Sequence, residues 1–235
     1  MTSTRIRRAP AALAALAMAV GLAACAASGG DASQPAAQSQ PPAQSEPPAQ
    51  SHSPQSAAPA ESNEAQGGSC PTSAPAPLSP GETREVTIET DLGNIVIGVE
   101  ADLGPLAVAN FVALAECGFY DGVIFHRIMP DFVIQGGDPT GTGSGGPGYE
   151  FPNDPVSVPY ERGVVAMANA GRDTNGSQFF IVLDEAGLPP DYSVFGRVTS
   201  GMEVADEISA GPSSGGQAGQ ALEPVAMNRV TVANP

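Results

Sequence analysis

Residues 125–138 read FHRIMPDFVIQGGD, and residues 167–181 read MANAGRDTNGSQFFI. Both stretches combine apolar residues that favour strands with the glycine, asparagine and glutamine of turns. Amide and guanidinium groups therefore stand beside phenylalanine rings along the same short segments. This combination predicts short strands that carry polar side chains next to exposed apolar ones.

Further elements surround these two stretches. Residues 85–99 alternate polar and apolar side chains on both sides of a turn-forming DLGN, which predicts a hairpin. Residues 105–117 favour a helix, because Pro105 suits its first turn and Gly118 the position after its end. We expect strands at 85–90, 95–99, 123–128, 132–135, 164–167, 179–182, 194–198 and 225–232, and a second helix at 201–209.

Many short strands and two helices indicate a mainly β domain at residues 84–233, which is long enough for one buried core. They favour a closed antiparallel barrel with helical caps, since closure removes free strand edges. His126 is the one histidine of this domain, and no acidic residue at ligand spacing makes it a metal site. We interpret His126 as a structural residue that is hydrogen-bonded within the fold and faces away from Arg127.

Both stretches closely resemble the signature motifs of the cyclophilins, the cyclosporin-binding peptidyl-prolyl isomerases. The segments GTG at 141–143 and VFG at 194–196 also match, in the expected order, and the resemblance covers residues 86–232. It implies an eight-stranded antiparallel barrel capped by two helices, with a surface groove for an X-Pro peptide. Rotation about such a bond breaks no covalent bond, so neither a nucleophile nor a cofactor is expected.

The resemblance assigns the catalytic role to Arg127, a permanent hydrogen-bond donor that would weaken amide conjugation near the prolyl nitrogen. The resemblance also implies an apolar pocket for the proline ring, main-chain contacts to the peptide and a far wall of the groove. The pocket residues are Phe132, Val133, Phe180 and Leu188, the contacts to the peptide come from Gln135, Ala168 and Asn169, and the wall is Tyr192.

The sequence departs from the family pattern at several points, one of which is the far wall, where Tyr192 stands in place of the usual histidine. Gly187 stands where well-known cyclophilins carry tryptophan, the loop 184–192 is one residue shorter, and Val133 replaces a methionine. Because that tryptophan contacts cyclosporin in the family, we expect weak cyclosporin binding with catalysis retained. The two alternatives to an enzyme are a non-catalytic module that binds proline-containing peptides and a structural surface antigen.

Residues 1–24 have the pattern of an export signal, with three early arginines and an apolar run that ends in LAAC at 22–25. This ending resembles the lipobox of bacterial lipoproteins and implies lipid attachment at Cys25. The alternative is a plain secretory signal with an incidental cysteine. A lipidated chain would be anchored to the cell membrane with its domain outside the cytoplasm.

Residues 25–80 are rich in Pro, Ala, Ser and Gln and contain no aromatic residue, which predicts a disordered tether. Cys70 lies near the end of this tether and Cys117 near the end of the first expected helix. In an exported chain they form either a disulfide that pins the tether to the domain or two free thiols.

The charge balance excludes several partners. The chain has 25 acidic and 9 basic residues, a net charge of −16, and every basic residue is an arginine. Proteins that bind nucleic acids or anionic lipid surfaces draw their affinity from basic residues, so neither is an expected partner of the domain. We expect a monomer whose partners are proline-containing polypeptides.

Overall fold

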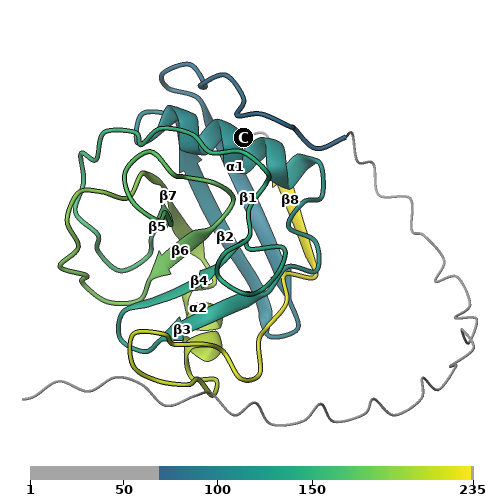
Figure 1. Ribbon diagram of the computed structural model, residues 1–235, viewed down its shortest axis with the longest axis vertical. Helices are drawn as coiled ribbons and strands as arrows, with labels where there is room; N and C mark the ends of the chain where they lie inside the picture. The colour runs from purple at the N-terminus through teal and green to yellow at the C-terminus, as the bar shows by residue number, and fades with distance from the viewer. Residues whose placement is uncertain (1–68, 234–235) are drawn as a thin grey trace, which may run out of the picture. The chain divides into compact units, whose positions relative to one another are not determined.

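The computed structural model describes residues 69–233, which contain eight strands and two helices (Figure 1). The elements are β1 (Thr83–Thr90), β2 (Gly93–Glu100), α1 (Pro105–Glu116), β3 (Phe125–Met129), β4 (Val133–Gly136), β5 (Val164–Met167), β6 (Phe179–Val182), β7 (Val194–Ser200), α2 (Met202–Ser209) and β8 (Arg229–Ala233). Their order and type agree with the expected elements. The last strand begins four residues later than expected, at Arg229.

The strands form one antiparallel sheet in the order β3-β4-β6-β5-β7-β2-β1-β8. The sheet curls strongly in Figure 1, but β3 and β8 stand at its two ends and share no ladder. Two isolated bridges, Ile124–Ala226 and Arg127–Gln220, and a few backbone hydrogen bonds join β3 and the residues before it to the segment that precedes β8, but they do not form a ladder. The expected closed barrel is therefore wrong: the sheet is an open, curled half-barrel. Pro224, which has no N–H to donate, lies in one of these segments and disfavours a continuous ladder there.

The sheet buries side chains on both of its faces at β5 and β6. Along β6, Phe179 and Ile181 join the main core, whereas Phe180 and Val182 join a second cluster on the outer face. This division follows from the alternation of side chains along a strand. All residues of β5 and β6 are consequently buried, and the outer cluster provides an apolar base for a surface site.

The two helices cover different parts of the sheet: α1 packs against β8, β7, β1 and β2, and α2 packs against β2, β4 and β3. The sequence of α1 offers no side chain to cap its own first turn. Instead the buried carboxylate of Asp154 accepts the N–H groups of Leu106 at 3.2 Å and Ala107 at 2.9 Å. A carboxylate at this position stabilises the free N–H groups and the positive end of the helix.

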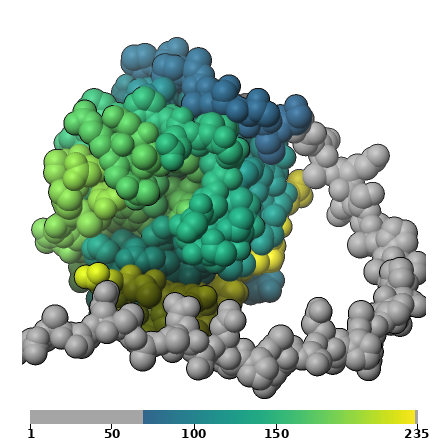
Figure 2. Space-filling view, viewed as in Figure 1, coloured from purple at the N-terminus to yellow at the C-terminus, as the bar shows by residue number. Residues whose placement is uncertain are grey.

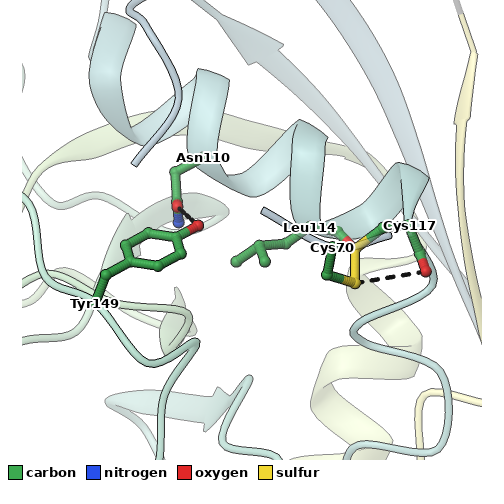
Figure 3. The surroundings of a disulfide bond; sticks show 5 residues. All are labelled: Cys70, Asn110, Leu114, Cys117 and Tyr149. Atoms are coloured by element: carbon green, nitrogen blue, oxygen red, sulfur yellow. Dashed lines mark hydrogen bonds between the residues drawn. A yellow bond between two sulfur atoms is a disulfide. The ribbon is translucent and has the colours of Figure 1, made fainter. Parts of the chain in front are cut away.

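Residues 69–82 lie along α1 and are joined to its end by a disulfide between Cys70 and Cys117, with 5.1 Å between the Cα atoms (Figure 3). Ala74 and Leu78 pack against the main core, and the Leu78 N–H donates to the carbonyl of Pro105 at 3.2 Å. This segment belongs to the blue atoms along the upper edge of Figure 2. Of the two interpretations of these cysteines, the disulfide is confirmed, and the segment predicted to end the tether rests on the domain.

The signal at 1–24, Cys25 and the tether as far as residue 68 lie outside the described residues. Within residues 69–233, no helix has the length and apolar character needed to cross a membrane.

Candidate active site

A pocket of about 280 Å³ opens on the outer face of the sheet. Its lining consists of the nine residues that the sequence assigned to the groove, and the structure brings all of them together. They are Arg127, Phe132, Val133, Gln135, Ala168, Asn169, Phe180, Leu188 and Tyr192.

Strand register places the polar and apolar halves of this pocket side by side. Arg127 on β3 pairs with Gln135 on β4, Gln135 pairs with Phe180 on β6, and Phe180 pairs with Ala166 on β5. Directly opposed residues share one face of a sheet, so the four side chains form a row across four strands. Arg127 reaches this row because a register shift in β3 lies between Phe125 and Arg127.

The apolar half of the pocket is centred on Phe180. This ring is 5% exposed and meets the ring of Tyr192 edge to face, with 5.6 Å between the ring centroids. Phe132 is placed by a tight turn in which Asp131 has φ of 59°. Its N–H donates to Met129 O at 3.1 Å, and its carbonyl accepts the Leu183 N–H at 2.8 Å. These contacts form an apolar site large enough for a proline ring.

The guanidinium of Arg127 is held at the edge of this apolar site by three groups. Nη1 donates to Gln135 Oε1 at 3.1 Å, and Nη2 donates to Gln217 O at 3.1 Å and contacts Met129 Sδ. Burial lowers the pKa of Arg127, and Tyr192 raises it. The guanidinium remains protonated, because the ordinary pKa of arginine is so high. It therefore presents a fixed cation with further N–H donors beside Phe180.

A glutamine that sequence reasoning did not assign to the site extends the polar half. Gln135 Nε2 donates to Gln178 Oε1 at 2.9 Å, and Gln178 Nε2 donates to the carbonyls of Gly143 and Gly145 at 3.1 and 2.9 Å. The sequence contained a signal for this residue. Gln178 is two positions before Phe180 and so extends the same face of β6.

The buried carboxylate of Asp138 organises the loop to which Gln178 binds. It accepts the N–H groups of Thr140 at 2.7 Å, Gly143 at 2.6 Å and Gly145 at 3.0 Å. Burial alone would raise the pKa of Asp138, but these hydrogen bonds, together with one from the Thr140 hydroxyl, hold it well below its ordinary value. Asp138 is therefore ionised, and its carboxylate fixes the loop through these hydrogen bonds.

A second pocket of about 620 Å³ adjoins the first and shares Gln135, Ala168 and Asn169 with it. The loop 143–150 and the residues around Gln178 form its other walls. The two pockets are therefore neighbours along these three residues.

His126 differs from its expected state. It is 6% exposed, and neither ring nitrogen has a hydrogen-bond partner among residues 69–233. Burial is the largest effect and lowers its pKa below the usual value, Asp138 acts in the opposite direction, and Arg127 lowers it further. The expected hydrogen bond is wrong because loop N–H and hydroxyl groups surround the carboxylate of Asp138, the nearby acceptor. Within the described part of the chain, no group of three or more His, Cys, Asp or Glu residues could hold a metal ion.

Comparison with known proteins identifies the class. Residues 85–232 match the family described as "Cyclophilin type peptidyl-prolyl cis-trans isomerase/CLD". A peptidyl-prolyl cis-trans isomerase of Helicobacter pylori is 46% identical over 135 residues, which are 55% of this chain and 83% of the relative. Peptidyl-prolyl cis-trans isomerase B of Bacillus subtilis is 51% identical over 113 residues, 47% of this chain and 79% of the relative.

Solved structures agree with these relatives. A cyclophilin type peptidyl-prolyl cis-trans isomerase of Cryptosporidium parvum is 33% identical, with a TM-score of 0.60 over 65% of this chain and 99% of that chain. The same protein in the presence of the dipeptide Ala-Pro gives a TM-score of 0.59. The chain belongs to the cyclophilin-type peptidyl-prolyl cis-trans isomerase family. It is accordingly an isomerase of X-Pro peptide bonds.

Proposed function

We propose that Arg127 is the catalytic residue and that the proline ring of the substrate occupies the 280 Å³ pocket beside it. The observation that supports this assignment is the fixed guanidinium at the edge of an apolar site. In a planar amide the nitrogen lone pair is delocalised, which creates a rotational barrier of about 18–20 kcal/mol. In the twisted amide the lone pair is localised, so an N–H donor near the nitrogen stabilises the transition state more than the ground state.

The remaining groove residues hold the peptide on both sides of the rotating bond. Gln135 keeps its side chain in place through Arg127 and Gln178 and lies where it can contact the peptide main chain. The side chain of Asn169 is already bound to Asp191 O at 2.9 Å and to the Gly171 N–H at 3.2 Å. Its main chain and that of Ala168 are therefore the groups that would contact the peptide. Phe132, Val133, Phe180 and Leu188 would surround the ring.

The test is isomerisation of an X-Pro peptide by the full-length protein and by Arg127→Ala. We expect the variant to lose about 100-fold or more in kcat/KM, the loss seen when one transition-state donor is removed. Arg162→Ala is the matched control, because Arg162 makes an exposed ion pair with Asp206 and lines neither groove pocket. A fully active Arg127→Ala would reject the mechanism. A folded wild type that binds the peptide without turnover would favour the proline-binding module.

We further propose that this isomerase is an exported lipoprotein, attached to the membrane through Cys25, that assists the folding of proteins outside the cytoplasm. The LAAC segment at 22–25 supports the anchor. The Cys70–Cys117 disulfide supports the compartment, since disulfides persist in oxidising environments. Uncatalysed X-Pro isomerisation takes tens to hundreds of seconds, so proteins that fold there would benefit.

Labelled fatty acid, supplied to cells that make the full-length chain, tests the anchor. We expect labelled protein that fractionates with membranes, and loss of both properties in Cys25→Ala. Cys70→Ala is the control and should keep the label. Labelling that persists in Cys25→Ala would exclude this cysteine as the attachment site, without bearing on the role of Arg127.

A further inference from the structure

The loop 184–192 forms one side of the proline pocket but contains no helix or strand. It leaves the sheet after β6 and returns at β7, and it carries both Leu188 and Tyr192. Gly187, at its tip, has open space around it: a Cβ added there would meet no atom within 4 Å. The position of the wall therefore depends on what holds the two ends of this loop.

One residue outside the pocket lining binds the loop on both sides of Gly187. The main-chain carbonyl of Tyr160 accepts the Ala186 N–H at 3.0 Å. Its side-chain hydroxyl accepts the Tyr192 N–H at 3.0 Å and donates to the Tyr192 carbonyl at 2.8 Å. A hydroxyl can donate and accept at once, so a single oxygen satisfies both main-chain groups of Tyr192.

The ring of Tyr160 also supports the pocket from behind. Tyr160 is 4% exposed and belongs to the outer cluster. Its ring centroid is 6.3 Å from that of Tyr192 and 6.5 Å from that of Phe180, within the range of favourable aromatic pairs. The wall and the base of the pocket therefore rest on the same buried residue.

We propose that Tyr160 is a positioning residue for the isomerase: its hydroxyl sets the distance between the loop-borne wall at Tyr192 and the strand-borne base at Phe180. Two other side chains hold the loop next to Tyr192, at Asp191. The carbonyl of Asp191 accepts hydrogen bonds from Asn153 Nδ2 at 2.7 Å and Asn169 Nδ2 at 2.9 Å. Tyr160 alone, among the described residues, bonds the N–H and carbonyl of Tyr192 itself. The inference rests on the proposed placement of the proline ring.

Tyr160→Phe in the full-length protein tests this role, because it removes one oxygen and keeps the ring. We expect KM for an X-Pro peptide, measured by NMR exchange spectroscopy, to rise about three- to tenfold, because the main chain of Tyr192 loses both of the hydrogen bonds that hold it. The value of kcat should change less than twofold. Arg127 is held by Gln135, Met129 and Gln217, none of which bonds to Tyr160.

Amide hydrogen exchange gives a readout that does not depend on activity. The Tyr192 amide should exchange at least about tenfold faster in Tyr160→Phe, while amides of β6 keep their protection. Tyr120→Phe is the matched control, because it also removes one buried hydroxyl that donates to a carbonyl, that of Ser177 at 3.0 Å. We expect it to lower stability and to leave KM and the Tyr192 amide unchanged.

An unchanged KM in Tyr160→Phe would overturn the proposal, whether or not the Tyr192 amide exchanges faster. Equal KM changes in the two tyrosine variants would also overturn it, since both would then reflect general destabilisation. Asn153→Ala provides an independent variant, because it removes one anchor of the adjacent Asp191 carbonyl and should raise KM by a smaller factor. Failure of the Arg127→Ala test would instead reject the proposed site as a whole.

Discussion

The two sides of the 280 Å³ pocket are held in place by different means. Val133, Gln135 and Phe180 belong to β4 and β6, where the ladder pairs Val133 with Val182 and Gln135 with Phe180. Leu188 and Tyr192 lie in a loop that is fastened by a few hydrogen bonds to side chains and main chain. A ladder distributes the restraint over many backbone bonds, whereas the loop depends on individual groups. The strand side should therefore be robust in position, and the loop side should be easier to alter without unfolding the protein.

Phe180→Ala should produce the largest loss of stability, because Phe180 is buried in the outer cluster, and it should also lower activity, because Phe180 forms the base of the pocket. We expect the free energy of unfolding to fall by about 3–5 kcal/mol. The value of kcat/KM should fall about tenfold or more. Chemical denaturation and peptide isomerisation measure the two effects.

Leu188→Ala is the matched change on the loop side. Leu188 is half-buried, so we expect a stability loss of about 1 kcal/mol or less and a smaller loss of activity. If Leu188→Ala destabilised the protein as much as Phe180→Ala, the contrast between the two sides would be wrong.

Asp138→Asn tests the support of the strand side. The carboxylate of Asp138 holds the loop to which Gln178 binds, and Gln178 in turn binds Gln135 on β4. We expect a loss of about 2–3 kcal/mol at neutral pH, because Asn replaces an ionised acceptor of several hydrogen bonds with a neutral one. The folded-state pKa of Asp138 lies below its ordinary value. Its stabilisation is therefore present above pH of about 4 and is lost as the pH falls toward the folded-state pKa.

Urea denaturation of wild type and Asp138→Asn at pH 7 and pH 3 measures this dependence. The difference between the two proteins should be smaller at pH 3. A difference that is the same at both pH values would show that the charge of Asp138 contributes nothing beyond its shape.

Gly187→Trp should have the smallest effect on isomerase activity and should sharpen the contrast on the loop side. Gly187 does not have a positive φ and has open space at its Cβ, so the backbone there accepts a residue with a side chain. We expect wild type to bind cyclosporin weakly, and Gly187→Trp to bind it about tenfold more tightly, or about 1.4 kcal/mol. Isomerase activity should stay within twofold of wild type. Equal cyclosporin affinities by calorimetry would contradict this account of the missing tryptophan.

Much of this architecture could be predicted because it depends on local rules. Alternation of side chains places Phe179 in the core and Phe180 on the outer face, and Pro105 and Gly118 mark the limits of α1. The resemblance to the cyclophilins identified the nine residues that line the pocket. Gln178 was missed even though its alternation with Phe180 was visible in the sequence.

The sequence by itself determined the order and type of the elements, because these follow from periodicity, and the residues that line the pocket, because long signature motifs resemble those of the cyclophilins. The tertiary structure alone decided the features that depend on distances between remote residues. Cys70 and Cys117 are 47 residues apart, and Tyr160 and Tyr192 are 32 apart. The open sheet belongs to the same group, as does the ring of His126, which has no hydrogen-bond partner among residues 69–233. Each of these features depends on which groups meet in space and on which donors and acceptors are already occupied. A local sequence pattern contains no information on either.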